Sequence, residues 1–178
     1  EIQDLLRASV GLNLALDFLP GSVMFDPAAG DKAPARIASE AVWFDAFVTN
    51  VDRTPRNPNL LIWHKELYFI DHGAALYFHH SWGDVEAAAR SRFPAIRSHV
   101  LLPWATELEA AHERLTARLS IALFRDILEQ VPDEWLIAEP GSETAASKRE
   151  GYLEFFKHRL DASAGFLEEA LLARAALV

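Results

Sequence analysis

The stretch that organises this sequence is residues 52–73, DRTPRNPNLLIWHKELYFIDHG. Its first part, through residue 59, is rich in Pro and Asn and therefore predicts a loop. Two short apolar runs follow, Leu60–Trp63 and Leu67–Ile70, with three residues between them. Short runs rich in Ile, Phe, Tyr and Trp around such a turn predict a β-hairpin. We expect the hairpin to turn the chain back, so that the end of the stretch faces its beginning.

Three polar residues of this stretch have a spacing that suits phosphoryl transfer. Asn57 lies five positions after Asp52, and Asp71 lies fourteen positions after Asn57. Transfer of a phosphoryl group from ATP needs a carboxylate that orients the attacking hydroxyl and accepts its proton. It also needs oxygen ligands for Mg²⁺, which uses one or two carboxylates together with the phosphates. A loop that holds Asp52 and Asn57, with Asp71 facing it across the hairpin, can supply both.

The chain before this stretch, residues 1–38, forms a first zone of mixed character. Glu1–Arg7 predicts a short helix. Strict alternation of apolar and polar residues over Leu12–Leu19 predicts a half-buried strand. Pro20-Gly21 ends that strand as a turn, and Pro27–Pro34 is expected to be a loop.

The second zone, residues 39–83, holds the loop and the hairpin. Ahead of them, Ser39 is placed to cap a helix that starts at Glu40. Apolar residues then recur at helical spacing as far as Val51.

The third zone, residues 84–178, is expected to be nearly all helix. Thr106 and Glu109 match a capping box at the start of one helix. A second helix is expected over Ser120–Gln130. A long helix is expected after Pro140-Gly141, with Gly165 as its weak point. The three zones together predict an α+β fold that is mainly α.

Composition excludes several classes of protein. The chain has 178 residues, 51% of them hydrophobic and 24% charged, which is typical of one globular domain. It has no Cys, so disulfides, zinc–thiolate sites and iron–sulfur sites are excluded. The net charge is −9 with no basic stripe, so we expect no nucleic-acid partner. No apolar run approaches the ~20 residues of a membrane helix, so we expect no membrane contact and a cytoplasmic location.

A longer string around the polar residues is more specific than their spacing. It comprises Trp43–Arg53, Asn57–Leu61 and Ile70–Leu76. This string resembles the HipA-like kinase family, a bacterial branch of the protein-kinase-like fold that is also similar to phosphatidylinositol 3- and 4-kinases. The dense part of the resemblance covers about residues 40–80, and a looser one in element order runs through the helical remainder.

The resemblance implies a role for each polar residue. Asp52 would be the catalytic base, Asn57 and Asp71 would hold Mg²⁺, and ATP would be the phosphoryl donor. The acceptor would be a hydroxyl of a protein Ser or Thr, or of a small alcohol. Five further residues are candidates for contact with phosphate or for support of these three: Asp45, Asn50, Arg53, His72 and Gly73.

Three of those five residues have alternatives that the sequence leaves open. Asp45 could support the site or simply make a buried or capping hydrogen bond. Arg53 and Arg56 could contact an anion or form salt bridges with neighbouring acids. His64, His72 and the pair His79-His80 invite a metal interpretation, although surface histidines are the more ordinary explanation.

The sequence departs from ordinary protein kinases in two respects within the motif and one outside it. His72 stands where those kinases have Phe, and Arg53 follows the catalytic Asp instead of preceding it. The chain has no G-x-G-x-x-G, and Lys32 is the only lysine before the motif. We therefore expect the chain to be a C-terminal catalytic lobe, with a helical bundle and the hairpin, whose N-terminal ATP-binding lobe lies upstream.

Two expectations follow from a missing lobe. The strand Leu12–Leu19 could be the hinge that leads from that lobe, and its bare apolar edge would favour a homodimer.

The sequence also leaves open a function other than that of a kinase. The chain could be an inactive relic of the fold that serves as a protein-binding module.

Overall fold

The structure, a computed structural model, describes residues 2–80, 82–137 and 144–177. It is an α+β fold that is mainly helical, as the sequence predicts. The helices have these bounds: α1 Ile2–Ala8, α2 Ala35–Phe47, α3 Val85–Ala89, α4 Leu108–Thr116, α5 Ile121–Glu129, α6 Asp133–Leu136, α7 Ala145–Asp161 and α8 Ser163–Ala175. The strands are β1 Val23–Met24, β2 Leu60–Trp63 and β3 Glu66–Phe69. Short 3₁₀ helices occur at Pro27–Ala29, Tyr77–His80, Pro94–Ser98 and Leu102–Trp104.

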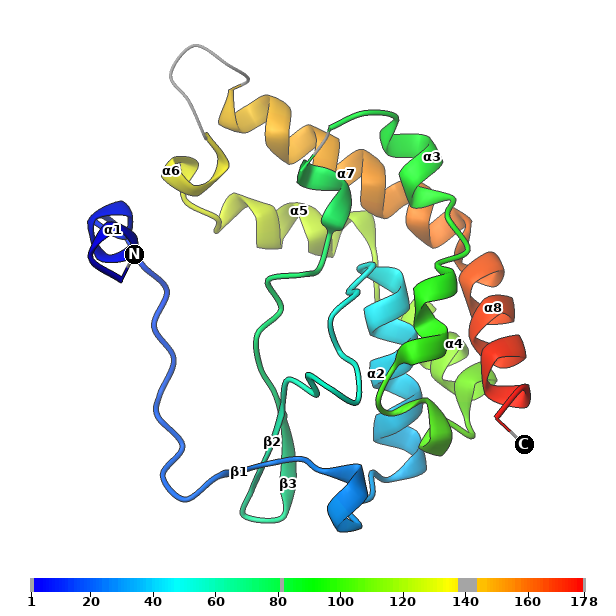
Figure 1. Ribbon diagram of the computed structural model, residues 1–178. Coiled ribbons are helices and arrows are strands. Elements are labelled where there is room, and N and C mark those ends of the chain that lie inside the picture. Colours follow the sequence, from blue (N-terminus) through cyan, green and yellow to red (C-terminus); the bar gives the residue numbers. More distant parts are fainter. Residues whose placement is uncertain (1, 81, 138–143, 178) are drawn as a thin grey trace.

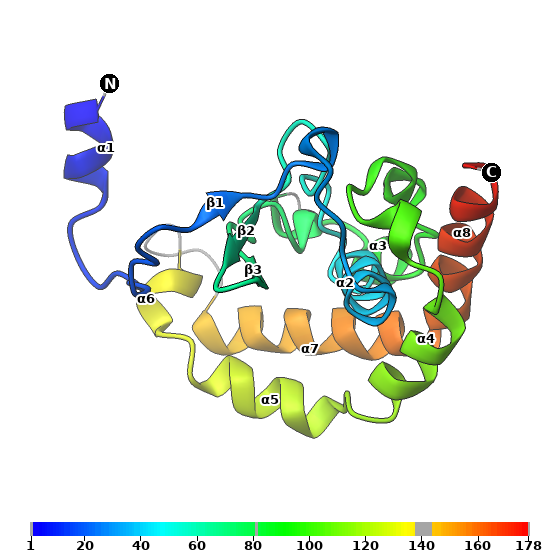
Figure 2. The same cartoon turned by 90° about the horizontal axis from the view of Figure 1, so that it is seen from below.

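Helix α2 is the centre of the helical part, with α4 and α8 packed against it. Helices α5 and α7 run side by side along one face (Figures 1 and 2), and α3 packs on α7. The small sheet lies at one end of this assembly, in the order β1-β2-β3, and all its strands are antiparallel. None of the described helices is long and apolar enough to cross a membrane.

The hairpin is confirmed, with a tighter turn than expected. Leu60 pairs with Phe69 and Trp63 pairs with Glu66, so only His64 and Lys65 remain in the turn. Both turn residues have positive φ, 49° and 68°. That conformation belongs to a type I′ turn, whose twist matches that of the flanking strands.

The strand predicted over Leu12–Leu19 is wrong. The structure has no strand there, and Leu14, Leu16 and Phe18 are 74–86% exposed. A strand needs a neighbouring strand to bond its backbone groups, and none of β1, β2 and β3 pairs with residues 12–19. The turn at Pro20-Gly21 does form, since Ser22 N–H donates to the Leu19 carbonyl at 3.2 Å.

Ser39 does not cap the helix that it was expected to begin. Helix α2 starts at Ala35, five residues before the predicted start at Glu40, and Ser39 is buried inside it with its hydroxyl donating to the Ala35 carbonyl at 2.7 Å. The same hydroxyl accepts from the backbone N–H of Glu107 at 2.9 Å, at the start of α4. The capping box of Thr106 and Glu109 is therefore also wrong, because a residue of α2 supplies the bond that a local side chain was expected to make.

The long C-terminal helix is divided in two. Helix α7 ends and α8 begins at Ala162, three residues before the predicted weak point at Gly165. The predicted start at Pro140-Gly141 lies outside the described residues. The helix expected over Ser120–Gln130 is confirmed as α5, with Ser120 accepting from Leu123 N–H as its N-cap.

The core is built around aromatic rings that project from α2. Phe47 stacks on Phe124 and Phe156 with ring centroids 5.7 and 5.8 Å apart, and Trp43 lies against Phe166 at 5.2 Å. These contacts join α2 to α5, α7 and α8, so the C-terminal end of α2 is held from three sides. The loop that follows that end therefore leaves from a fixed point.

A buried arginine on α7 completes this junction. Arg159 is fully buried, and its guanidinium donates to the carbonyls of Phe47, Ala46 and Ala89 at 3.1, 2.5 and 2.8 Å, and to that of Ser91. These carbonyls lie at the C-terminal ends of α2 and α3, where helices leave acceptors unpaired and favour a positive charge. Burial lowers the pKa of Arg159 to about 10, so it remains charged at neutral pH.

Replacement of Arg159 should destabilise the fold strongly. Arg159→Met keeps most of the side-chain volume but leaves the carbonyls at two helix ends without a donor. We expect the free energy of unfolding in urea to fall by roughly 3 kcal/mol or more, since each unpaired buried group costs ~1–3 kcal/mol. Arg125→Met, at an exposed position of α5, is the control and should change it by less than ~0.5 kcal/mol. Equal urea midpoints for the two variants would contradict this account.

Candidate active site

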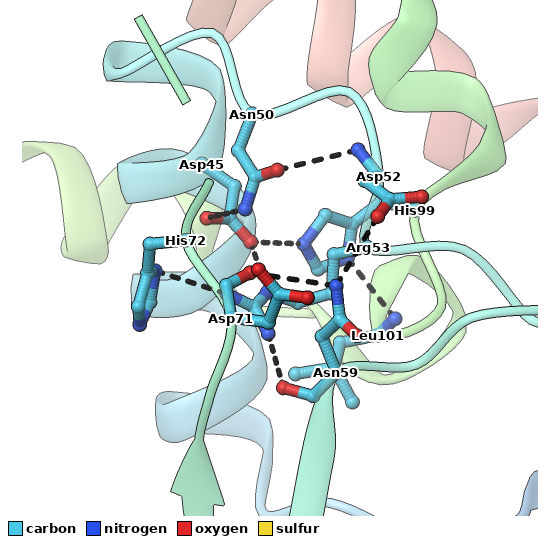
Figure 3. Close-up of polar contacts among 9 residues, drawn as sticks. All are labelled: Asp45, Asn50, Asp52, Arg53, Asn59, Asp71, His72, His99 and Leu101. Atoms are coloured by element: carbon cyan, nitrogen blue, oxygen red, sulfur yellow. Dashed lines mark hydrogen bonds and ion pairs between the residues drawn. The ribbon is translucent and has the colours of Figure 1, made fainter. Parts of the chain in front are cut away.

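Asp52, on the loop between α2 and β2, lies at the edge of the polar group drawn in Figure 3. Its Oδ2 accepts from the Asn57 amide at 2.6 Å and, more weakly, from the Asn59 amide at 3.4 Å. The loop reverses direction between these residues through two backbone bonds that join Thr54 and Asn57. The spacing of five residues thus brings Asn57 back onto Asp52.

Asn59 connects this loop to the turn after β3. Its amide nitrogen donates to the Asp71 carbonyl at 3.4 Å as well as to Asp52 Oδ2. The Asp71 carbonyl oxygen and Asp52 Oδ2 therefore lie within twice 3.4 Å of each other. The hairpin supplies the register, since Ile70 N–H donates to the Asn59 carbonyl at 3.0 Å. Asn59 and Asp71 both have φ of 48°, a left-handed conformation that Asn and Asp adopt more readily than other residues.

The Asp71 side chain is exposed and closes a small turn of its own. Its Oδ1 accepts from Gly73 N–H at 3.3 Å. A Cβ at position 73 would lie 3.3 Å from this oxygen, a tight contact that a small shift of the exposed carboxylate would relieve. The structure therefore brings Asp52, Asn57 and Asp71 to one side of the fold.

A buried ion pair lies beneath these residues. Arg53 and Asp45 are 1% and 2% exposed, and Arg53 Nε donates to Asp45 Oδ2 at 2.5 Å. The other guanidinium nitrogens donate to the Asn59 carbonyl at 2.5 Å and to His72 Nδ1 at 3.3 Å. The guanidinium also lies 5.2 Å from the centre of the Phe69 ring. One side chain thus joins α2, the loop, β3 and the turn.

Of the alternatives left open by the sequence, Arg53 forms the salt bridge with a neighbouring acid, and Asp45 forms buried hydrogen bonds. Arg53 is enclosed, so it does not face a substrate, whereas Arg56 is exposed on the loop. Asn50 is also buried, and it donates to Asp45 Oδ1 at 3.0 Å while accepting from Asp52 N–H at 3.2 Å. Asn50 therefore links the buried pair to the backbone of Asp52.

His99 is a member of this group that the sequence did not indicate. It is 5% exposed; its Nδ1 accepts from Leu101 N–H at 3.1 Å, and its Nε2 lies 2.9 Å from Asp45 Oδ2. Since Nδ1 is an acceptor, the proton of the neutral ring is on Nε2 and is donated to Asp45. Asn59 also had no predicted role. Its position next to Pro58 and directly before β2 is the sequence feature that could have indicated one.

Burial and charge act in opposite directions on Asp45. Desolvation would raise its pKa, but the hydrogen bond from His99 and the charge of Arg53 outweigh it, so the pKa of Asp45 lies below its ordinary value. Burial lowers the pKa of His99, which outweighs the attraction of Asp45 for a second proton. At neutral pH the group therefore consists of the Asp45 carboxylate, the Arg53 guanidinium and the neutral His99 imidazole.

The site offers oxygen ligands and not a nitrogen cluster to a metal. Among the described residues, no group of three or more His, Cys, Asp and Glu side chains gathers. His79 instead contacts the Tyr152 hydroxyl at 3.2 Å. Because the Asn57 nitrogen is directed at Asp52, its oxygen is the atom left for a cation, and Asp71 presents a carboxylate. One amide and one carboxylate suit Mg²⁺, which takes its remaining ligands from phosphate and water.

An Asp followed by an Asn in one loop, and then by an Asp-x-Gly turn, is the order of the catalytic-loop and metal-binding motifs of protein kinases. The family model for HipA-like kinases matches residues 3–163, so the chain belongs to the HipA-like kinase family. No curated protein and no solved structure gives a significant match to the chain.

Stability should depend on pH through His99. Because its folded pKa is below the ordinary value near 6.5, the unfolded chain binds the extra proton first and stability falls as pH drops below about 6.5. Asp45 does not contribute in this range, since its effect is lost only below its ordinary value of 3.8. We expect the melting temperature to fall between pH 7.5 and pH 5.5, and to fall less in His99→Gln.

The control for this measurement is His64→Gln, at an exposed position of the hairpin turn, which should keep the decline of the wild type. His79 also has a pKa lowered by burial, so a residual decline should remain in His99→Gln. The same decline in His99→Gln as in His64→Gln would show that His99 is not the buried neutral group described here.

Proposed function

We propose that the chain carries the catalytic residues of a kinase that transfers the γ-phosphoryl group of ATP to a hydroxyl. The observation that supports this most is the arrangement around Asp52, where two amides converge on one carboxylate oxygen and one of them also holds Asp71. The family match supports a kinase in general, and the step and the residue roles are our proposal.

Asp52 is assigned the role of general base. Asn57 and Asn59 both direct their donors at Oδ2, which leaves Oδ1 for the attacking hydroxyl. As the acceptor oxygen forms its bond to the γ-phosphorus, its proton passes to Asp52, and the bond to the β-phosphate oxygen breaks to release ADP. The residue is half-buried, so it can be both positioned by the loop and reached by a substrate.

Asn57 and Asp71 are assigned to Mg²⁺. When bound, the ion neutralises charge on the phosphates. Asn57 then has two tasks, because its nitrogen orients Asp52 while its oxygen faces the ion. Contacts to the phosphates from a Gly-rich turn and a lysine are assigned to an ATP-binding lobe outside residues 1–178. The acceptor hydroxyl belongs to a protein Ser or Thr or to a small alcohol.

Asp52→Asn should separate binding from catalysis. In the protein that includes the ATP-binding lobe, we expect unchanged ATP affinity and a fall in phosphoryl transfer of ~10²–10⁴-fold, which is the usual cost of removing a general base. Asp126→Asn, exposed on α5, is the matched control and should keep the wild-type rate. Transfer by Asp52→Asn within about threefold of wild type would exclude Asp52 as the base.

The metal assignment predicts a different signature. Asp71→Ala should remove the Mg²⁺ dependence of ATP binding, measured by calorimetric titration with and without the ion, because Asp71 is the assigned carboxylate ligand. Asn57→Ala should weaken that dependence less but should also lower the transfer rate, since Asp52 loses its 2.6 Å hydrogen bond. Asp161→Ala, exposed at the end of α7, is the control. If Mg²⁺ still strengthens ATP binding to Asp71→Ala as it does in the control, the assignment fails.

A further inference from the structure

Asn59 contacts both the proposed base and the turn that carries a proposed metal ligand. Its side-chain nitrogen donates to Asp52 Oδ2 and to the Asp71 carbonyl, each at 3.4 Å (Figure 3). The residue is 5% exposed and lies directly before β2. An amide nitrogen carries two hydrogens and can therefore make both bonds at once. Both donor hydrogens of Asn59 are thus directed at residues to which a function is assigned.

The contribution of Asn59 to the fold comes from its backbone. Its carbonyl accepts from the Arg53 guanidinium at 2.5 Å and from Ile70 N–H at 3.0 Å. The first bond satisfies part of the buried ion pair, and the second continues the pairing of β2 with β3. A residue of another type that adopted its φ of 48° would supply the same carbonyl. The side chain is therefore not needed for these two contacts.

The groups that the side chain faces require an amide at this position. Both of them, a carboxylate oxygen and a carbonyl oxygen, are hydrogen-bond acceptors. Aspartate adopts a left-handed backbone as asparagine does, but its carboxylate would present further acceptors and would repel Asp52. Glycine adopts it as well and has no donor. Asparagine combines this backbone with two side-chain donors, so the contacts to Asp52 and Asp71 account for the residue type.

The orientation of the Asp52 carboxylate depends on the donors that reach it. The torsion that turns an aspartate carboxylate is broad and two-fold, so one hydrogen bond leaves the carboxylate plane able to rotate. Asn57 donates to Oδ2 at 2.6 Å, and Asn59 donates to the same oxygen from the β2 end of the loop. Two donors from different points of the chain restrict the plane. They thereby set the direction of Oδ1, which the proposed function assigns to the attacking hydroxyl.

We propose that Asn59 is a positioning residue of the phosphoryl transfer reaction and that it couples the base to the metal-binding turn. It acts through Asp52, whose Oδ1 it directs, and through the Asp71 backbone, which it holds at a fixed distance from the base. The inference rests on the proposed kinase function, in which Asp52 is the base and Asp71 binds Mg²⁺. Loss of the amide should slow transfer and raise the Mg²⁺ requirement, and it should leave the KM for ATP unchanged at saturating Mg²⁺.

Two variants remove the amide at different cost to the backbone. Asn59→Gly accepts the left-handed conformation without strain, whereas Asn59→Ala does not and should be less stable. In the protein that includes the ATP-binding lobe, both should lower kcat by about ten- to a hundredfold, because misplacement of a reacting group by about 1 Å can cost ~10²-fold. Both should raise the Mg²⁺ concentration that gives half the maximal rate by about two- to tenfold, which corresponds to one neutral hydrogen bond.

Lys65→Gly is the matched control, because Lys65 also has a left-handed backbone, with φ of 68°, and is exposed in the hairpin turn. It should keep the wild-type kcat and Mg²⁺ dependence. All rates are divided by the folded fraction from urea unfolding, so a loss of stability is not counted as a loss of rate. Wild-type kcat and Mg²⁺ dependence in Asn59→Gly, with losses confined to Asn59→Ala, would assign Asn59 a backbone role only and would overturn the inference.

A double variant tests whether Asn59 acts through Asp52. At saturating Mg²⁺ the Asp52→Asn variant has no base left to orient, so the addition of Asn59→Gly should lower its remaining rate by less than about threefold. A further loss as large as that in the wild-type background would overturn the inference. A wild-type rate in Asp52→Asn would reject the proposed function itself. A slow Asp52→Asn together with a wild-type Asn59→Gly would reject only the role of Asn59.

Discussion

The ion pair between Arg53 and Asp45 is the interaction on which the rest of the site depends. Two charges removed from water are stable only when each also has its hydrogen bonds satisfied. Asp45 meets this condition with donors from Asn50 and His99 as well as Arg53. Arg53 meets it with the Asn59 carbonyl and His72 as well as Asp45. The requirement to satisfy one buried pair therefore fixes a helix, a loop and a turn relative to each other.

This arrangement explains how the proposed catalytic residues can be accessible to a substrate and yet have a defined geometry. Asp52 is the chain neighbour of Arg53, and His72 is the neighbour of Asp71, so the buried contacts hold the backbone directly beside each carboxylate. Asn59 then adds a link at the surface between the two. In ordinary protein kinases the arginine precedes the catalytic aspartate and Phe stands where His72 does here. In this chain the two residues at these differing positions, Arg53 and His72, contact each other.

The local features of the site could be predicted from the sequence, and the long-range ones could not. The loop, the hairpin and the closeness of Asp52, Asn57 and Asp71 follow from turn residues and strand patterns within one short stretch. His99 lies 54 positions from Asp45, and no local pattern marks such a partner. The prediction that Ser39 caps a helix is wrong because its hydroxyl bonds to the start of α4, and the prediction of a strand over Leu12–Leu19 is wrong because no strand of the sheet pairs with that segment.

The central claim is that Arg53 and Asp45 act as a coupled buried pair, and a double-mutant cycle on their stability tests it most directly. Asp45→Asn, Arg53→Met and the double variant would be compared by urea unfolding. Each single change should cost ~3–5 kcal/mol, because it leaves one buried charge without its partner. The double variant should be more stable than the sum of the two losses predicts, by about 2 kcal/mol or more. Losses that add to within ~0.5 kcal/mol would show that the two residues act independently and would contradict the account.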